Sequence, residues 1–318
     1  MRSPARLLPL GLLAVAASAV GQSAAGQSSA GAFTVAETGQ HYGTLQDAVS
    51  SIRLGTGTVV IAPGTYHECA IQSGGRITFR AAQPGRVIFE GTACEGKAVL
   101  VLRGSESTVD GIVFRGIRVG DGNGAGIRTE VGDLHVVNSM FLDSQEGILG
   151  GQPVGQRITI DRSTFAGLGQ CDETPSCSHA IYLANKGQVT ITRSRFERGR
   201  GGHYVKLRVP NVSITDNSFD DTRGHKTNYM IDLSEGATGL IARNTFVQGR
   251  DKENWTGFVV VAAEAKTYSS AGLRIEDNTA SLAPGETRSP AFVANASRQQ
   301  LAVGANKLGA GVRPYEVR

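Results

Sequence analysis

Alternating apolar and polar positions recur along the chain in short segments that end in the same way. Each segment ends with Asn, Arg or Asp, then Ser or Asn, and two residues later Phe, at residues 134–141, 158–165, 189–196, 212–219 and 240–246. Alternation with a period of two predicts a β-strand with one buried face. Counting fainter copies that close at positions 114 and 280, the copies recur every 23 to 34 residues, which is typical of a stacked repeat protein.

A second short alternating segment lies between successive copies. It occurs at residues 126–130, 180–184, 204–208 and 230–234. No helical pattern fills the connections, so strands that repeat in one direction must stack as the coils of a parallel β-helix. A β-sandwich also needs many short strands, but it does not require this fixed order of two strand types.

The segment before the repeats predicts a short helix within residues 40–52. Thr44 is a suitable N-cap with Asp47 three residues later. Apolar residues then lie on one helical face, at Leu45, Ala48, Val49 and Ile52. Because a solenoid must cover the open end of its first coil, we expect this helix to be the N-terminal cap.

The N-terminus has the features of a secretory signal peptide. Arg2 and Arg6 precede the apolar run 7–20, and small residues that suit cleavage follow it. We expect a signal peptide at 1–25, a flexible leader at 26–32 and the β-helix domain at 33–318. The apolar run is short for a membrane span. The predicted protein is therefore exported, periplasmic or secreted, without stable insertion in a membrane.

The four cysteines, Cys69, Cys94, Cys171 and Cys177, allow three pairings that sequence alone does not choose between. Cys171 and Cys177 would close a short loop. Cys69 and Cys94 are 25 residues apart, close to the repeat length, so they could stack on successive coils. Their spacing does not match a zinc site, and we expect two disulfides in an oxidising compartment.

Composition adds to this picture without changing it. Glycine is 42 of 318 residues, and only 6% of residues are aromatic, which fits many tight turns around a thin aliphatic core with one Phe in each coil. The net charge is +4 and falls to +2 when the two arginines of the signal peptide are removed. An argument from charge must therefore be local.

The N-terminal segments carry a family resemblance. Residues 44–48, followed by Ile61-Ala-Pro-Gly-Thr-Tyr66, resemble the first coil of right-handed parallel β-helix proteins of the pectate-lyase-like superfamily. The resemblance extends over about 33–301. It implies a right-handed, all-β solenoid, and it implies a member close to the polysaccharide lyases. The same fold hosts hydrolases, epimerases and binding proteins.

Stacking the second strand type in register predicts an inward aliphatic column and an outward polar column. The inward residues are Ile127, Ile148, Ile181, Val205, Ile231 and Val259. Outward residues that would gather on one exposed sheet face are Arg128, Tyr182, Lys206 and Asp232, with Arg208 two residues along the strand of Lys206. His179 and His203 are expected to stack on each other where their strands begin.

Long polar loops before these strands would wall one side of that face. They carry basic residues and one Trp, at Arg198, Arg200, His225, Lys226, Arg250, Lys252 and Trp255. A locally basic groove fits an acidic polysaccharide. We therefore expect Arg200, His225, Lys226 and Trp255 to bind substrate, with His179, Arg128 and Asp232. No nucleic-acid motif is present, so nucleic acid is not an expected partner, and a monomer is expected.

An acidic polysaccharide suggests β-elimination at a uronate, which needs a neutralised carboxylate, a base for the C5 proton and an acid for the leaving O4. The resemblance to polysaccharide lyases of this fold implies Lys or Arg as base, with calcium or arginine as the neutraliser. We assign Lys206 as base, Arg208 as the carboxylate ligand and Tyr182 as acid, with His203 as a relay. A neighbouring arginine would lower the pKa of Lys206.

Four alternatives stay open. A uronate C5 epimerase shares the proton abstraction, and a non-catalytic carbohydrate-binding envelope protein would use the solenoid only as a scaffold. Asp172 and Glu173 could approach Asp232 from their loop, which leaves a glycoside hydrolase or a Ca²⁺ site open. Lys206 and Asp232 could also form only a solvated surface pair. No metal is predicted with named ligands, and no cofactor is required.

Overall fold

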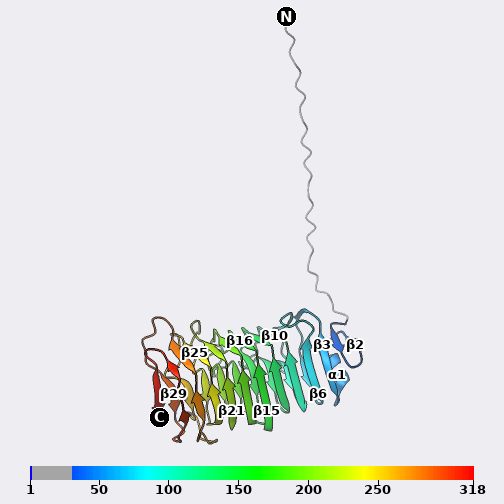
Figure 1. Ribbon diagram of the computed structural model, residues 1–318. Helices are drawn as coiled ribbons and strands as arrows, with labels where there is room; N and C mark the ends of the chain where they lie inside the picture. The colour runs from blue at the N-terminus through cyan, green and yellow to red at the C-terminus, as the bar shows by residue number, and fades with distance from the viewer. Residues whose placement is uncertain (2–30) are drawn as a thin grey trace.

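The computed structural model describes residue 1 and residues 31–318, and the described chain winds into a solenoid of stacked coils (Figure 1). The predicted signal peptide beyond Met1 and residues 26–30 of the predicted leader lie outside the described residues. Each coil contributes strands to three sheets that run along the solenoid. All strand pairs are parallel except those of the first strand, which confirms the predicted parallel β-helix.

Sheet A has twelve strands, in the order β2 (Gln40–Tyr42), β1 (Phe33–Val35), β3 (Thr56–Ile61), β6 (Arg76–Ala81), β9 (Glu106–Asp110), β12 (Asp133–Val137), β15 (Val154–Asp161), β18 (Lys186–Thr192), β21 (Asn211–Thr215), β24 (Thr238–Ala242), β27 (Arg274–Glu276) and β30 (Ala302–Val303). Sheet B has ten, from β31 (Lys307–Leu308) through β28 (Thr279–Leu282), β25 (Thr245–Gln248), β22 (Ser218–Asp220), β19 (Arg195–Glu197), β16 (Thr164–Ala166), β13 (Met140–Leu142), β10 (Ile112–Arg115) and β7 (Val87–Glu90) to β4 (Gly64–Tyr66). Sheet C has ten, from β32 (Arg313–Val317) through β29 (Ala291–Asn295), β26 (Gly257–Val261), β23 (Ile231–Leu233), β20 (Val205–Leu207), β17 (Ile181–Leu183), β14 (Glu146–Gly150), β11 (Ala125–Thr129) and β8 (Ala98–Leu102) to β5 (Ala70–Gln72).

The first coil is closed by the helix α1 (Leu45–Ile52), as predicted. The Thr44 hydroxyl accepts a hydrogen bond from the Asp47 backbone N–H, so Thr44 is the N-cap. Leu45, Ala48 and Val49 are buried on one helical face. The helix packs on β1 and β5 and covers apolar surface that an open first coil would expose.

The core is a continuous stack of side chains from successive coils. One buried Phe per coil stacks on the next in sheet B, with ring centroids 4.7–5.1 Å apart from Phe114 to Phe246. Aliphatic columns of sheets A and C fill the rest of the interior. The sparse aromatic residues therefore lie where the repeat pattern places them.

The turn from sheet A to sheet B explains the polar part of the repeat. Its first residue is a non-glycine residue in a left-handed conformation in six coils, for example Arg193 at φ 49° and Arg243 at φ 55°. The residue that follows points inward and hydrogen-bonds the next coil. In the later coils these are asparagines, so the Asn244 side-chain oxygen accepts from the Asn217 N–H at 3.0 Å. The motif is thus a turn that satisfies buried backbone groups.

Both expected disulfides are present, which resolves the pairing. Cys69 bonds Cys94, with Cα atoms 5.5 Å apart, and Cys171 bonds Cys177 across a separation of six residues. In the described part of the chain, no helix has the length and apolar character needed to cross a membrane.

Candidate functional site

The outer face of sheet C carries the polar residues that the register predicted to meet. Tyr182 lies beside Lys206, and Lys206 lies beside Asp232, on β17, β20 and β23. Arg128 and Leu149 continue the same row toward the N-terminus. Because the neighbouring inward residues are buried aliphatics, the alternation of the strands holds these polar side chains outward.

Two cations lie against one aromatic ring at the centre of this face. The Lys206 Nζ is 5.6 Å from the centroid of the Tyr182 ring, and the Arg208 Cζ is 5.5 Å from it. Such contacts are favourable cation–π interactions. The Lys206 side chain is 10% exposed and the Arg208 side chain 30% exposed. The predicted grouping of Tyr182, Lys206 and Arg208 is therefore confirmed. The predicted exposure is wrong for Lys206 and Asp232, because both residues are buried.

A glutamate that the sequence analysis missed joins the two cations. The Glu264 Oε1 lies 2.6 Å from the Lys206 Nζ, and its Oε2 accepts a hydrogen bond from Arg208. Burial acts against the charge of Glu264, but these contacts hold its pKa below the ordinary value. Lys206 therefore pairs with Glu264 and not with Asp232, so the simple surface pair of Lys206 and Asp232 is wrong.

His179 and His203 stack as expected, with ring centroids 5.0 Å apart. The His203 backbone N–H donates to the His179 Nδ1 at 3.0 Å. Both residues are buried. Burial lowers the pKa of His179 to about 3 and the pKa of His203 well below its usual value. Both imidazoles are therefore neutral near pH 7.

Asp232 is almost completely buried beside this pair. Its Oδ2 accepts from the Ser234 hydroxyl at 2.6 Å and lies 3.5 Å from the His203 Nε2. Burial raises the pKa of Asp232 to about 6, against the smaller opposing effect of the Ser234 hydrogen bond. Asp232 is therefore a carboxyl group that gains and loses its proton close to neutral pH.

A second missed carboxyl, Glu146, lies at the other end of the histidines. It pairs in register with Ala125 at the start of β14 and its side chain is fully buried, so its pKa is raised well above the usual value. A sequence signal for it exists. Glu146, His179, His203 and Tyr229 each precede the outward row by three residues, so shifting the register by three positions finds the whole row.

Unpaired buried polar atoms concentrate on this face. Eight buried side-chain nitrogen or oxygen atoms of the described residues lack a hydrogen-bond partner, and five of them are Arg128 Nε, Glu146 Oε2, His203 Nδ1, Arg208 Nε and Asp232 Oδ1. Buried polar groups are normally paired in folded proteins. Their grouping marks this face as a candidate site for a polar ligand.

Two of the loop residues that were predicted to bind substrate form ion pairs with other loop residues. His225 pairs with Asp251 at 2.6 Å and Lys226 pairs with Asp172 at 2.7 Å, and all four are exposed. Arg200 is also exposed. Trp255 is half-buried and lies under Arg288, whose Cζ is 5.6 Å from the Trp255 ring centroid.

Two loop expectations are wrong. The Lys252 side chain is fully buried and pairs with Asp221 at 3.1 Å, so it is not part of a basic wall. Asp172 binds Lys226, and Glu173 binds Arg118 and Gln145. These contacts engage both carboxylates away from Asp232, against the expectation that they approach it.

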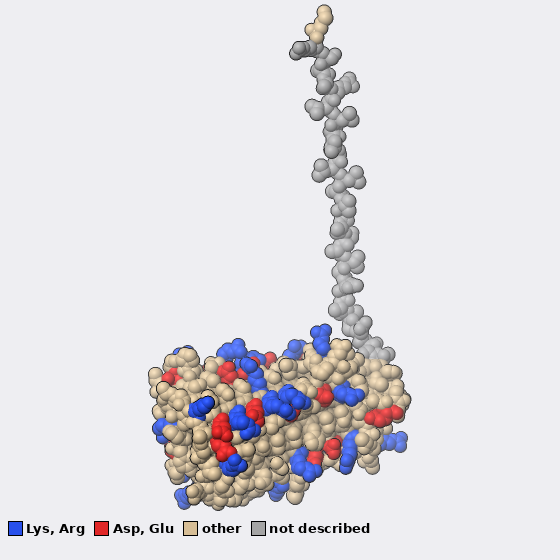
Figure 2. Space-filling model, viewed as in Figure 1, with Lys and Arg blue, Asp and Glu red and all other residues tan. Residues whose placement is uncertain are grey.

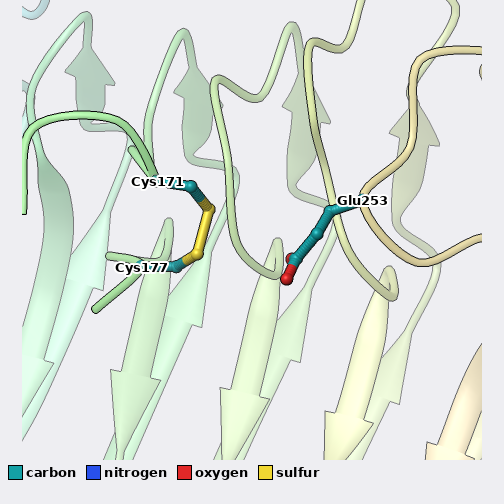
Figure 3. A group of neighbouring side chains, drawn as sticks. All are labelled: Cys171, Cys177 and Glu253. Atoms are coloured by element: carbon teal, nitrogen blue, oxygen red, sulfur yellow. A yellow bond between two sulfur atoms is a disulfide. The ribbon is translucent and has the colours of Figure 1, made fainter. Parts of the chain in front are cut away.

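The cluster of metal-ligating side chains found among residues 31–318 does not suit calcium. Calcium takes six to eight oxygen ligands. Among the described residues one cluster has metal-ligand spacing, namely Cys171, Cys177 and Glu253, and Figure 3 shows that its two sulfurs are bonded to each other. A disulfide supplies no thiolate, so this cluster does not fit the ion, and no step of the chemistry is assigned to calcium.

Comparisons with known proteins agree with the fold. The sequence matches the family of the right-handed beta helix region over residues 97–285, more than half of the chain. No curated protein matches it. A solved structure titled ORF18, from Geobacillus virus E2, aligns with a TM-score of 0.53 and 15% identity over 85% of this chain and 55% of that one. This chain thus spans little more than half of that protein, and the likeness shows the fold alone. On the family match, the chain belongs to the right-handed β-helix family.

Proposed function

We propose that the protein is an exported enzyme that cleaves a uronate-containing polysaccharide by β-elimination. The observation that supports this most directly is the grouping of Tyr182, Lys206 and Arg208 on the outer face of sheet C, with both cations against the Tyr182 ring. These are the residue types that an acid, a base and a carboxylate ligand require. An extended sugar chain would lie along the face and cross successive coils, about 4.8 Å apart.

Binding begins with the substrate carboxylate. The Arg208 guanidinium can hold it through two hydrogen bonds. Partial neutralisation of this carboxylate makes the adjacent C5–H bond more acidic, because the charge that develops on proton removal is stabilised. The exposed loop cations Arg200 and Lys226 add a weaker attraction for a polyanion.

The elimination step removes one proton from C5 and adds another proton to the leaving oxygen O4. Lys206 is an ammonium paired with Glu264 in the free protein, so it first gives one proton to water. The resulting amine takes the C5 proton, the C5–H electrons form a C4=C5 double bond, and the C4–O4 bond breaks. Tyr182 donates its phenolic proton to O4 and regains a proton from water. Burial raises the pKa of Tyr182, so it holds the proton that this role needs. The neutral His179 and His203 pack beside these groups and position them.

A panel of acidic polysaccharides tests the proposal. The wild-type protein should release products with a new ultraviolet absorbance, since the double bond is conjugated with the carboxylate. Lys206→Ala should lower the rate about 10²- to 10³-fold, as expected for removal of a general base, and Tyr182→Phe should lower it similarly. Lys186→Ala, at an exposed position of sheet A, is the matched control.

Other outcomes would contradict the lyase. Solvent deuterium at C5 without cleavage would identify an epimerase. Binding that survives Lys206→Ala and Tyr182→Phe, with no product from any substrate, would identify a non-catalytic binding protein. Activity that is equal in the wild type and Lys206→Ala would remove Lys206 from the mechanism.

Glycoside hydrolysis is the second candidate, and one observation favours it. Burial raises the pKa of Asp232 to about 6, whereas Lys206 and Arg208 hold Glu264 ionised. Two nearby carboxyl groups with opposite shifts are typical of a glycosidase acid and its ionised partner. New reducing ends without ultraviolet absorbance, lost in Asp232→Asn, would support hydrolysis over elimination.

A further inference from the structure

Glu264 reaches the candidate site from the segment that follows β26. The backbone of this segment is fixed to the preceding coil, because the Glu264 and Ala265 N–H groups both donate to the Ser234 carbonyl, at 3.0 and 3.1 Å. The Tyr268 N–H donates to the Glu235 carbonyl at 2.9 Å. The position of the Glu264 backbone therefore does not depend on its carboxylate.

The carboxylate of Glu264 uses both oxygens to bridge two cations. One oxygen lies 2.6 Å from the Lys206 Nζ and the other accepts from Arg208. Both cations contact the Tyr182 ring. Two charge-assisted hydrogen bonds to one planar carboxylate are the geometry with which proteins bind carboxylate ligands.

Exposure differs across this contact. The Glu264 side chain is 40% exposed, whereas the Lys206 side chain is 10% exposed. Glu264 can rotate into water at little desolvation cost, but Lys206 stays largely buried and would then lack its counterion. Arg208 keeps the Glu235 carboxylate 3.7 Å from its Nε. Lys206 is therefore the cation that needs a replacement anion, and that anion does not need to be Glu264.

We propose that Lys206, Arg208 and Tyr182 form a carboxylate-binding subsite, and that Glu264 occupies it in the free protein as an intramolecular substitute for the ligand. A ligand carboxylate takes the place of Glu264, whose side chain turns outward while its backbone stays fixed. The inference rests on the proposed function only for the class of ligand, a uronate.

Competition by Glu264 lowers the apparent affinity for any carboxylate ligand. Only molecules in which the Glu264 side chain has turned away from Lys206 and Arg208 can bind the ligand. The neutral amide in Glu264→Gln holds the cations less strongly. Charge-assisted hydrogen bonds typically contribute more than neutral ones, so we expect this variant to bind a uronate about tenfold more tightly than the wild type.

The test is an NMR titration of the full chain with D-glucuronate, which does not depend on turnover, and with D-glucose as the neutral probe. Glu264→Gln should tighten glucuronate binding about tenfold and leave the response to glucose unchanged. Glu106→Gln is the matched control, because Glu106 is 39% exposed and pairs with Arg76 at 3.7 Å. It removes one equally exposed ion-paired carboxylate and should leave affinity unchanged.

Two further variants keep the test decisive. Glu264→Asp keeps the charge and should bind glucuronate with an affinity between the two proteins. Arg208→Gln combined with Glu264→Gln should lose the gain, because the subsite itself is then incomplete.

The failures are distinguishable. Equal affinity of the wild type and Glu264→Gln, or no glucuronate binding by either, overturns this inference. Tighter binding by Glu264→Gln with no unsaturated product from any polysaccharide supports the subsite and overturns the lyase.

Discussion

Two groups of ionisable side chains on the same solenoid differ in their burial and in how folding shifts their charge. In the turns from sheet A to sheet B, Arg193 pairs with Asp161 at 2.7 Å and Arg243 pairs with Asp216 at 2.8 Å. The arginine side chains of these pairs are 58% and 53% exposed. On sheet C, the side chains of His203 and Asp232 are less than one-tenth exposed. Figure 2 shows basic and acidic side chains intermixed along one face of the solenoid.

The difference lies in what burial does to each group. In the turns, the hydrogen bond from Arg243 lowers the pKa of Asp216, so folding favours the charged form. On sheet C, burial raises the pKa of Asp232 and lowers that of His203, and polar atoms remain unpaired there. A functional site is therefore indicated by buried ionisable groups whose charged form burial destabilises, and not by a high density of charged side chains.

The largest expected effect comes from breaking a buried ion pair in the loops beside the site. The Lys252 ammonium lies 3.1 Å from the Asp221 carboxylate, and both side chains are fully buried. Lys252→Met would leave the Asp221 charge unpaired, so we expect the free energy of unfolding to fall by about 3–5 kcal/mol. Urea denaturation measures it.

Arg243→Met is the control for that experiment. It breaks the ion pair between Arg243 and Asp216 in the turns. Exposed ion pairs of this kind contribute about 0–1 kcal/mol to the free energy of unfolding. Similar losses in the two variants would show that burial does not separate the two groups.

The next effect is a pH-dependent gain of stability. Because folding raises the pKa of Asp232 from 3.8 to about 6, the wild-type protein loses stability as the pH rises through that window. Asp232→Asn removes this penalty. At pH 7 it should be more stable than the wild type by about 2–3 kcal/mol, and the gain should vanish below about pH 4.

Asp216→Asn gives the opposite sign in the turns. The lowered pKa of Asp216 means that its charge stabilises the fold above the unfolded pKa, so the variant should be slightly less stable at pH 7, and equal at low pH. Denaturation curves from pH 3 to 8 test both variants. A gain for Asp232→Asn that does not depend on pH would exclude titration of Asp232 as its cause.

Much of this architecture was predictable because the repeat fixes the register. The alternation around Ile181, Val205 and Ile231 places Tyr182, Lys206 and Asp232 side by side, and neither the strand order nor the cap needed further information. Glu146 was accessible to the same reasoning, because it lies three residues before Leu149 in the outward row. Residues on strands were thus predictable because their neighbours are set by a constant offset.

Residues on loops were not predictable in that way. Glu264 reaches Lys206 from 58 positions along the chain, through a segment with no repeat pattern. Lys252 resembles the exposed cations around it in sequence, and only the path of its loop buries it against Asp221. Loop geometry depends on contacts that vary from coil to coil, so the partners of loop residues follow from the structure alone.

The smallest effect tests whether exposed charge contributes anything near the site. Lys226 lies in a loop beside sheet C, is exposed and pairs with Asp172 at 2.7 Å. If a polyanion passes over this loop, Lys226→Ala should raise KM about two- to threefold without changing kcat, since exposed charges act weakly. The difference should disappear at about 1 M salt, where the Debye length falls to about 3 Å. Arg193→Ala, in the turns on the other side of the coil, should change neither constant at either salt concentration. An equal rise of KM for both variants would mean that the polyanion responds to the overall charge of the protein. The distinction between the two groups of side chains would then hold for the buried residues of sheet C. It would not hold for the loops around them.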